Sequence, residues 1–484
     1  MSILKLGFVP TYRYFGRIPD WSAQMRQQSL SAFAQLKGVE VIAPMPHPVD
    51  PNAVDATLGF VPDGAVGQLD HAVVIADYFA RQKVDGLIIG ALDFGDERSS
   101  ALVAEKLGVP VLVYATREPP VPAGPSLARV SDSYCGTLSI ASALYRRKIP
   151  FHYAGIFFPD ESAFLAEIET FARAVSVVKA LRGARIGQVG LRPASFETVG
   201  YDEAAMIQKF SQHVIHQEMF EIIQTANGYP AGDPTVAAAR QSLKASAASV
   251  TVSEVYLEKA ARLELALTEF WQKNHLSAMG MSCWPSIQAA YGISVCAIYG
   301  RLTEKGMLTA CETDILGALS MLVNYAAALG QTVPHFIDWT IQHRSDNNRF
   351  LAWHCGNAPA CLADHPDRTG LRSRYDMAGQ RIADPKDVQS GLYQFQIRAG
   401  KVTFCRLAEY DNQWKMLITT GDIVPSTETL AGTWAWVELR DHQRLYRTLV
   451  EEGFIHHASM IHGDQTQALQ QACKFLGIQT VLVE

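Results

Sequence analysis

The sequence lacks several features that would place it in other functional classes. No run reaches the roughly 18 uncharged apolar residues that a membrane-spanning helix needs. The first ten residues lack the basic start and long apolar core of a signal peptide. The 42 basic and 48 acidic residues form no concentrated basic face of the kind that nucleic-acid binding requires. We therefore expect a cytoplasmic protein whose partners are neither nucleic acids nor membranes.

Paired cysteines and nucleotide-binding loops are missing as well. The eight cysteines are scattered without a CxxC pair, which is typical of reduced, mostly buried thiols, and we expect no chemistry from them. Neither GxGxxG nor GxxxxGK[ST] occurs, which argues against the use of dinucleotides or ATP. No GxSxG nucleophile elbow is present either. The candidate chemistry must therefore come from carboxylates and histidines.

The residues that are present have the composition of a globular protein, with 48% apolar and 19% charged residues. In the first 150 residues, short apolar runs such as 85–89 and 109–114 alternate with segments of helical period such as 69–82. Buried strands separated by amphipathic helices are typical of a parallel sheet covered on both faces. A second unit of this kind begins near Gly183, and 294–297 is a further strand candidate.

From about Val333 the pattern changes to short alternating runs separated by Gly, Asn and Asp, which indicates antiparallel strands. The sequence therefore predicts an α/β protein with two doubly wound parallel-sheet domains followed by an antiparallel β-rich C-terminal domain. We expect the domains to span residues 1–172, 173–332 and 333–484.

Carboxylates gather near the junction of the second and third predicted domains. Glu312 and Asp314 directly precede a helix expected from residue 315, where the helix dipole favours acidic residues, so that simple capping is one interpretation. Asp338 lies within the apolar segment Phe-Ile-Asp-Trp. A carboxylate buried in a strand is costly unless a cation meets it. We favour a functional role for Asp338, with a structural aspartate as the alternative.

Histidines supply further candidate ligands. His354 ends a strand at a Gly turn, and His456, His457 and His462 precede the last helix. Imidazole and carboxylate groups suit Mn²⁺, Mg²⁺ or similar ions, although each histidine alone is more often structural. If the segment is extended, His456 and His457 point to opposite faces, and at most one of them reaches a given site.

Weaker candidates come from aromatic and basic residues. Trp434 and Trp436 alternate along a strand, where they could stack on a sugar or pack in a core. Arg13 and Arg17 follow the first strand and could reach a ligand, although surface arginines are common there. Together with Arg192, they leave room for a substrate with an anionic group.

One segment points to a known family. Cys-Glu-Thr-Asp-Ile-Leu-Gly-Ala-Leu-Ser-Met, at 311–321, resembles the motif that opens a catalytic helix in the L-fucose isomerase family. The resemblance continues with Asp338 and with His457, which is followed six residues later by a glycine. Segments 132–136 and 283–285 also fit, and the related L-arabinose isomerases share the architecture.

This resemblance implies a metal-dependent aldose–ketose isomerase that acts on an open-chain sugar through an enediol. The sugar would be L-fucose, D-arabinose or a related or modified sugar. The family binds Mn²⁺ through a Glu, an Asp and a His, which implies Glu312, Asp338 and His457, with Mg²⁺ or Co²⁺ as other divalent cations. Glu312 and Asp338 would also be the catalytic acid–base pair, which agrees with metal-assisted proton transfer.

The resemblance extends to neighbouring residues and to assembly. His354 is similar to a further ligand of the arabinose branch, or it lies behind the ligands, and Gln288 matches a glutamine near the substrate. A homo-oligomer, often a hexamer, is implied, with each site completed by a neighbouring subunit's first domain. Two alternatives stay open: a metal-dependent sugar lyase or epimerase, and a non-catalytic sugar-binding protein on the same scaffold.

Overall fold

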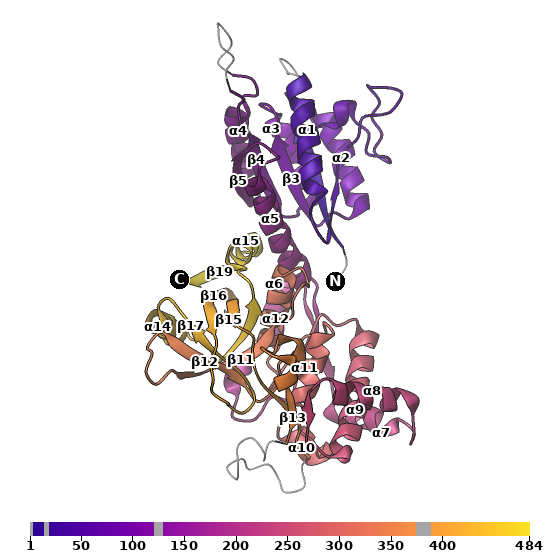
Figure 1. The fold of residues 1–484 in the computed structure, drawn as a ribbon. Helices are drawn as coiled ribbons and strands as arrows, with labels where there is room; N and C mark the ends of the chain where they lie inside the picture. Colours follow the sequence, from indigo (N-terminus) through magenta and orange to yellow (C-terminus); the bar gives the residue numbers. More distant parts are fainter. Residues whose placement is uncertain (1–2, 14–18, 121–128, 374–388) are drawn as a thin grey trace. The chain divides into compact units, whose positions relative to one another are not determined.

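The computed structural model describes residues 3–13, 19–120, 129–373 and 389–484. The chain divides into two compact units, which are described separately (Figure 1). Unit 1 contains Met1–Lys179 and Gln470–Leu476. Unit 2 contains Ala180–Leu469 and Gly477–Glu484.

Unit 1 is built on a five-stranded parallel sheet with the order β2-β1-β3-β4-β5. Every residue of β3 and β4 is buried, as expected of central strands covered on both faces. The strands are β1 (Leu4–Thr11), β2 (Val39–Ile42), β3 (Gly86–Ala91), β4 (Val111–Thr116) and β5 (Phe151–Phe157).

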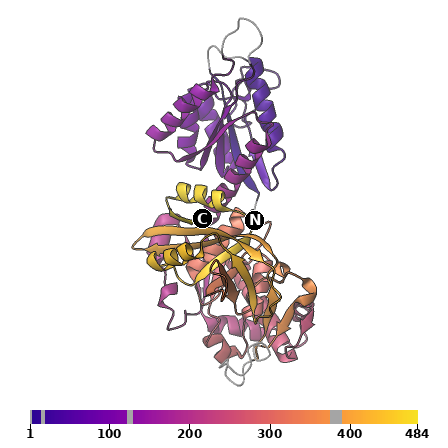
Figure 2. The same cartoon turned by 60° about the vertical axis from the view of Figure 1, so that its left-hand side comes forward.

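Helices cover both faces of this sheet (Figure 2). Apolar side chains of α2, α3 and α4 form one core with the sheet. On the other face, aromatic rings from α1 and α5 pack on the strands: the rings of Phe33 and Phe164 lie 5.1 Å from Phe8 and 4.8 Å from Tyr114, respectively. The helices are α1 (Pro19–Phe33), α2 (Leu69–Gln82), α3 (Glu97–Leu107), α4 (Ser133–Arg146), α5 (Ser162–Leu181) and α15 (Thr466–Leu476).

Unit 2 begins with a four-stranded parallel sheet of order β10-β9-β6-β7. Its strands are β6 (Arg185–Val189), β7 (His213–Gln217), β9 (Ala278–Met281) and β10 (Thr309–Ala310). Its helices are α6 (Glu203–Phe210), α7 (Met219–Gly228), α8 (Pro234–Ala245), α9 (Glu254–Asn274), α10 (Ser286–Tyr291), α11 (Cys296–Glu304) and α12 (Ile315–Ala327).

The strand expected at 294–297 is wrong. The hydroxyl group of Ser294 donates to the backbone oxygen of Gly391 and accepts from the backbone N–H of the same residue. Helix α11 begins at Cys296. All residues from Cys296 to Thr303 are buried. A short apolar run that is buried on every side has the same pattern in a helix and in a strand, so that periodicity alone did not separate them.

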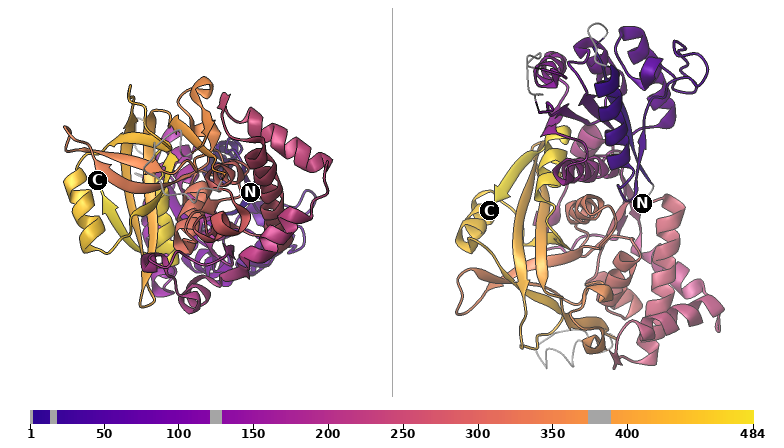
Figure 3. Two further views of the ribbon diagram at one scale, coloured as in Figure 1. Left: turned by 90° about the horizontal axis from the view of Figure 1, so that it is seen from below. Right: turned by 45° about the horizontal axis from the view of Figure 1, so that its top comes forward.

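The second sheet of unit 2 has ten strands in the order β19-β16-β15-β18-β11-β12-β17-β14-β13-β8. Its longest hairpin, β15–β16, is orange in Figure 3 and turns at Asp411 and Asn412, whose φ values of 53° and 61° suit a tight hairpin turn. The elements are β8 (Ser249–Val250), β11 (His335–Gln342), β12 (Arg349–His354), β13 (Gly370–Arg372), β14 (Leu392–Gln396), β15 (Gly400–Tyr410), β16 (Gln413–Val424), β17 (Thr433–Glu438), α14 (His442–Glu451), β18 (His457–His462) and β19 (Gln479–Val483).

The predicted fold class is confirmed: two parallel-sheet α/β parts precede a largely antiparallel, β-rich part. Helix α12 contacts both β9 and β10 of the parallel sheet and β15 and β18 of the larger sheet, so both sheets belong to unit 2. The three domain boundaries drawn from the sequence stay a prediction. Across the described ranges, no helix combines the length and the apolar character that crossing a membrane requires.

Candidate active site

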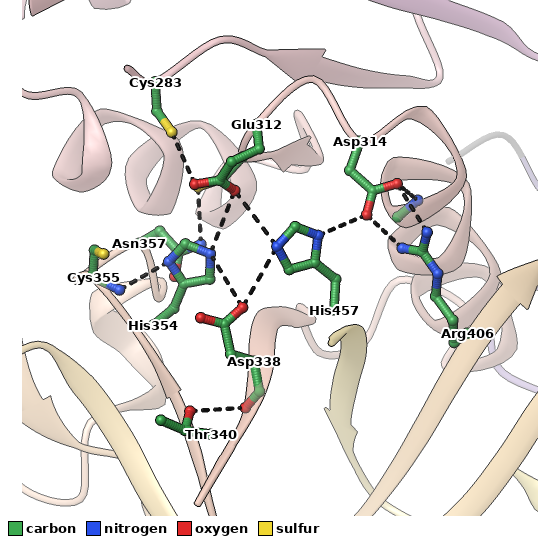
Figure 4. A network of polar contacts seen from close by, with 12 residues as sticks. Cys283, Glu312, Asp314, Asp338, Thr340, His354, Cys355, Asn357, Arg406 and His457 are labelled. Carbon is green, nitrogen blue, oxygen red and sulfur yellow. Dashed lines mark hydrogen bonds and ion pairs between the residues drawn. The ribbon is translucent and has the colours of Figure 1, made fainter. Parts of the chain in front are cut away.

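The predicted carboxylates and histidines meet at the start of β18 in unit 2 (Figure 4). Asp338 on β11 is paired directly with His457 on β18, and opposite residues of antiparallel strands share a face. His354 is the last residue of β12, which pairs with the other edge of β11. Glu312 lies in the short turn between β10 and α12. Four separate segments thus deliver one side chain each.

These side chains form a ring in which carboxylate oxygens and imidazole nitrogens alternate. His457 Nε2 lies 3.7 Å from Glu312 Oε2 and 3.5 Å from Asp338 Oδ1. His354 Nε2 lies 3.8 Å from the same glutamate oxygen and 4.0 Å from the same aspartate oxygen. All four distances exceed that of a good hydrogen bond. The four atoms therefore face one point without bonding to one another.

The donor set fits a divalent cation. Glu312 Oε2 and Asp338 Oδ1 are buried and have no hydrogen-bond partner among the described residues. Buried charged oxygens without partners are costly, and a cation between them would remove that cost. Two ligands of one ion, each about 2.1 Å from it, stand roughly 3 to 4.2 Å apart, which brackets the spacing of the ring. Oxygen and imidazole ligands suit Mn²⁺ and related ions.

The backbone at Glu312 is held in a rare conformation. Glu312 and Thr313 have φ values of 54° and 59°, in the left-handed region that residues other than glycine seldom adopt. Each such residue costs on the order of 1–3 kcal/mol, and residues of this kind cluster at functional sites. The N–H of Thr313 bonds to Met281 of β9, which anchors the turn. The surrounding structure thus imposes the direction of the Glu312 side chain.

Asp314 and Arg406 orient His457 from behind. His457 Nδ1 lies 2.9 Å from Asp314 Oδ2, and the two Asp314 oxygens accept from Arg406 at 2.6 and 3.0 Å. Burial by itself would raise the pKa of Asp314, but Arg406 and His457 outweigh it and hold that pKa well below its usual range. Burial by itself would lower the pKa of His457, but the hydrogen bond and charge of Asp314 outweigh it and raise that pKa. A cation at the centre would take the place of the Nε2 proton, and the ring would then present its Nε2 lone pair, as metal-binding histidines do.

His354 has the opposite proton arrangement. Its Nδ1 accepts a hydrogen bond of 2.8 Å from the backbone N–H of Cys355. A neutral imidazole has one donor and one acceptor nitrogen, so His354 carries its proton on Nε2, the atom that faces Glu312 and Asp338. The two histidines therefore differ: His457 would offer a lone pair to a cation at the centre, whereas His354 offers an N–H group.

Burial makes both carboxylates weak acids in the absence of a cation. It raises the pKa of Asp338 to about 7. The nearby charge of His457 lowers this pKa, and the charge of Glu312 raises it further. Burial also raises the pKa of Glu312, although His457 and the Cys283 thiol partly offset it. Buried carboxyl groups with shifted pKa values are typical of functional sites.

His456 lies beside the centre as well. The expectation of opposite faces assumed an extended segment, but β18 begins only at His457. The rings of His456 and His457 are 4.1 Å apart, and ligand atoms of both histidines and of Asp338 lie within 4.8 Å of one another. Phe196 lies on the loop after β6, and its ring centroid is 5.6 Å from that of His456 and 6.4 Å from that of His457.

The other predicted residues have different surroundings. Gln288 is buried in α10, and Trp434 is 2% exposed on β17, where it packs with Leu351 and Trp436. Arg13 belongs to unit 1, where it forms an ion pair with Asp132 at 3.1 Å. Arg17 lies outside the described residues. The roles of all four stay predictions.

Sequence reasoning missed Arg406 and the second role of Asp314. Asp314 does cap α12 by accepting from the N–H of Gly317, as the capping interpretation predicted. It also binds Arg406 and His457, which are 92 and 143 residues away. One signal was available: Arg406 is a single charged residue in an otherwise buried apolar stretch of β15, and such a residue requires a partner.

Comparison with known proteins adds independent evidence. The family model "Fucose/sulfoquinovose isomerase, N-terminal domain" matches residues 48–182, and "L-fucose isomerase, C-terminal domain" matches residues 352–484. Together the two matches cover more than half of the chain.

Several curated relatives are sulfoquinovose isomerases. The sulfoquinovose isomerase of Alkalicoccus urumqiensis is 25% identical over 404 residues, which cover 83% of this chain and 86% of that protein. The sulfoquinovose isomerase of Priestia aryabhattai is 25% identical over 424 residues, which cover 87% and 90%. The solved structure of a periplasmic solute binding protein of an ABC transporter from Actinobacillus succinogenes 130z, with bound D-allose, aligns at 11% identity over 68% of this chain and 89% of its own, with a TM-score of only 0.17. The chain belongs to the L-fucose isomerase-like family and is an isomerase that interconverts aldose and ketose sugars.

Proposed function

We propose that this isomerase depends on a divalent metal ion, with Mn²⁺ as the first candidate, held by Glu312, Asp338 and His457. The observation that supports this most directly is the pair of buried carboxylate oxygens that have no hydrogen-bond partner among the described residues and that both face His457 Nε2. When bound there, the ion would polarise the sugar carbonyl and stabilise negative charge on the enediol oxygens.

Glu312 and Asp338 would move the protons. One carboxylate takes the proton from C2 of the open-chain aldose while the carbonyl oxygen on C1 gains a proton, which gives a 1,2-enediol. The proton is then returned to C1 while the hydroxyl on C2 loses its own proton, which gives the ketose. The raised carboxyl pKa values place these groups closer to neutrality, where acid–base catalysts work best.

His354 would position the substrate as a hydrogen-bond donor. Its Nε2–H points toward Glu312 and Asp338, where an oxygen of the sugar could accept it. A neutral donor near the carbonyl oxygen stabilises the charge that develops on that oxygen. The ring is 3% exposed and packs against Phe336, with the ring centroids 5.7 Å apart, so its direction is set before substrate arrives.

We further propose an anionic aldose as the substrate, with sulfoquinovose as the first candidate. This rests on the relatives, which are sulfoquinovose isomerases and align over more than four fifths of the chain. The exposed Arg192 is a candidate for binding the anionic group: it lies on the same loop as Phe196, which packs on His457. An arginine guanidinium can bind a tetrahedral anion through two donors.

The test is ketose formation from a panel of pentoses, 6-deoxyhexoses and anionic hexoses, with chelator-treated protein before and after addition of Mn²⁺. We expect conversion of an anionic hexose only when the ion is present. Glu312→Gln should keep the fold, seen by circular dichroism, and abolish turnover. Full activity in the chelator-treated protein would refute metal dependence, and an active Glu312→Gln variant would refute the assigned role. Fragments in place of a ketose would indicate a lyase.

A further inference from the structure

Two thiols lie close to Glu312. Cys283 follows β9 and Cys311 follows β10, and these strands are parallel neighbours, so both cysteines emerge at the same edge of the sheet. Ligand atoms of Cys283, Cys311 and Glu312 all lie within 4.8 Å of one another. The cysteines are 6% and 0% exposed. The sheet therefore places two sulfur atoms and a carboxylate in one buried cluster.

The two oxygens of Glu312 face different partners (Figure 4). Oε1 accepts from Cys283 Sγ at 3.1 Å, whereas Oε2 faces the two imidazoles at 3.7 and 3.8 Å. Cys311 Sγ in turn accepts from Asn357 Nδ2 at 3.4 Å. The carboxylate thus stands between an oxygen–nitrogen set on one side and a sulfur set on the other.

The chemistry of the two sets differs. Thiolate ligands select soft or borderline ions such as Zn²⁺, Cd²⁺ and Cu⁺, whereas carboxylate and imidazole suit Mn²⁺ and Mg²⁺. We propose that Cys283, Cys311 and Glu312 Oε1 form a second metal site, specific for thiophilic ions, whose occupation inhibits the isomerase. The effect on turnover rests on the function proposed above, since it acts through Glu312. Binding replaces the proton of each thiol with the ion, and both protons pass to solvent.

The shared carboxylate explains why occupation would inhibit. A cation on Oε1 withdraws negative charge from Glu312 and adds a like charge close to the resident ion. Excess Mn²⁺ relieves this effect only in part, because the two ions use different oxygens and can occupy their sites together. A thiophilic ion that merely replaced Mn²⁺ in the resident site would be displaced by excess Mn²⁺.

The experiment is a Cd²⁺ titration of the full-length, Mn²⁺-loaded protein in a reductant that is not a thiol. Sulfur-to-cadmium charge-transfer absorption and bound Cd²⁺ per chain are measured in the wild type and in Cys283→Ser, Cys311→Ser and Cys405→Ser. Cys405 is the matched control, since it is equally buried but lies on β15 of the larger sheet, where its thiol donates to the backbone oxygen of Ser320 on α12. We expect one tight Cd²⁺ with the absorption of two thiolates, weakened about 10- to 100-fold in the first two variants and unchanged in the control.

Two results would overturn the second site: Cd²⁺ binding without thiolate absorption, or the same absorption and affinity in both Cys283→Ser and Cys311→Ser. Inhibition of turnover is measured in parallel at saturating Mn²⁺ and should persist in the wild type. Complete relief of that inhibition by excess Mn²⁺ would refute the inhibitory role. The absorption does not require turnover, so failure of the proposed isomerase activity and failure of the thiol site are separately visible.

Discussion

Asp338 should destabilise the metal-free protein at neutral pH, and Asp338→Asn should remove that penalty. Burial raises the pKa of this carboxyl from 3.8 to about 7, so the folded protein binds its proton more tightly than the unfolded chain does. Between about pH 4 and pH 7 the unfolded chain releases the proton while the folded state retains it. Folding stability therefore falls as the pH rises through this window.

The shift sets the size of the effect. A difference of about three pKa units corresponds to an upper limit of about 4 kcal/mol, at 1.36 kcal/mol per unit. Relaxation of the neighbouring charges reduces this, and we expect a gain of about 2 kcal/mol for Asp338→Asn above pH 7. In a unit of this size that gain raises Tm by roughly 4 °C. Near pH 4 most of the gain should be lost, because the folded aspartate is then protonated and the unfolded one is about half protonated.

The assay is thermal unfolding of chelator-treated wild type and variant at several values between about pH 4 and pH 8. Asp422→Asn is the matched control: this aspartate lies exposed in the same sheet, and its replacement should change stability by less than about 0.5 kcal/mol. Added Mn²⁺ should stabilise the wild type and leave Asp338→Asn unaffected. An Asp338→Asn protein less stable than the wild type at pH 8 without metal, or a difference that does not vary with pH, would refute the reasoning.

Three further predictions concern single side chains. His354→Gln should lower kcat about 100-fold or more while Mn²⁺ affinity, measured by calorimetry, changes little, because we propose that the ring acts as a donor and not as a ligand. A comparable loss of Mn²⁺ affinity would contradict this tautomer. Arg406→Met leaves Asp314 buried without its cation and should cost about 3–5 kcal/mol in urea unfolding, whereas a loss below about 1 kcal/mol would exclude a structural ion pair. Glu264→Gln breaks the buried bonds to Arg301 and should lower the free energy of unfolding by about 2–4 kcal/mol. The kcat per folded molecule should not change, and a lower kcat in the folded fraction would link this pair to the active site.

The sequence by itself determined the fold class and the main candidates for the site. Apolar runs of strand length alternating with helical periods report local conformation and burial, so they indicate parallel sheets covered by helices. Asp338 was visible for a similar reason: a carboxylate within an apolar strand must be compensated by a partner. Glu312 and His457 came from the family resemblance, and the structure brings both to Asp338.

Only the tertiary structure decided how these groups are supported and what each histidine offers. Asp314 meets Arg406 and His457 across 92 and 143 residues, and Cys283 meets Glu312 because β9 and β10 are neighbours in the sheet. The proton on His354 depends on one backbone N–H, which no sequence pattern reports. Periodicity records which face of each element is buried, whereas partners distant in sequence depend on strand order and on the packing of the whole unit.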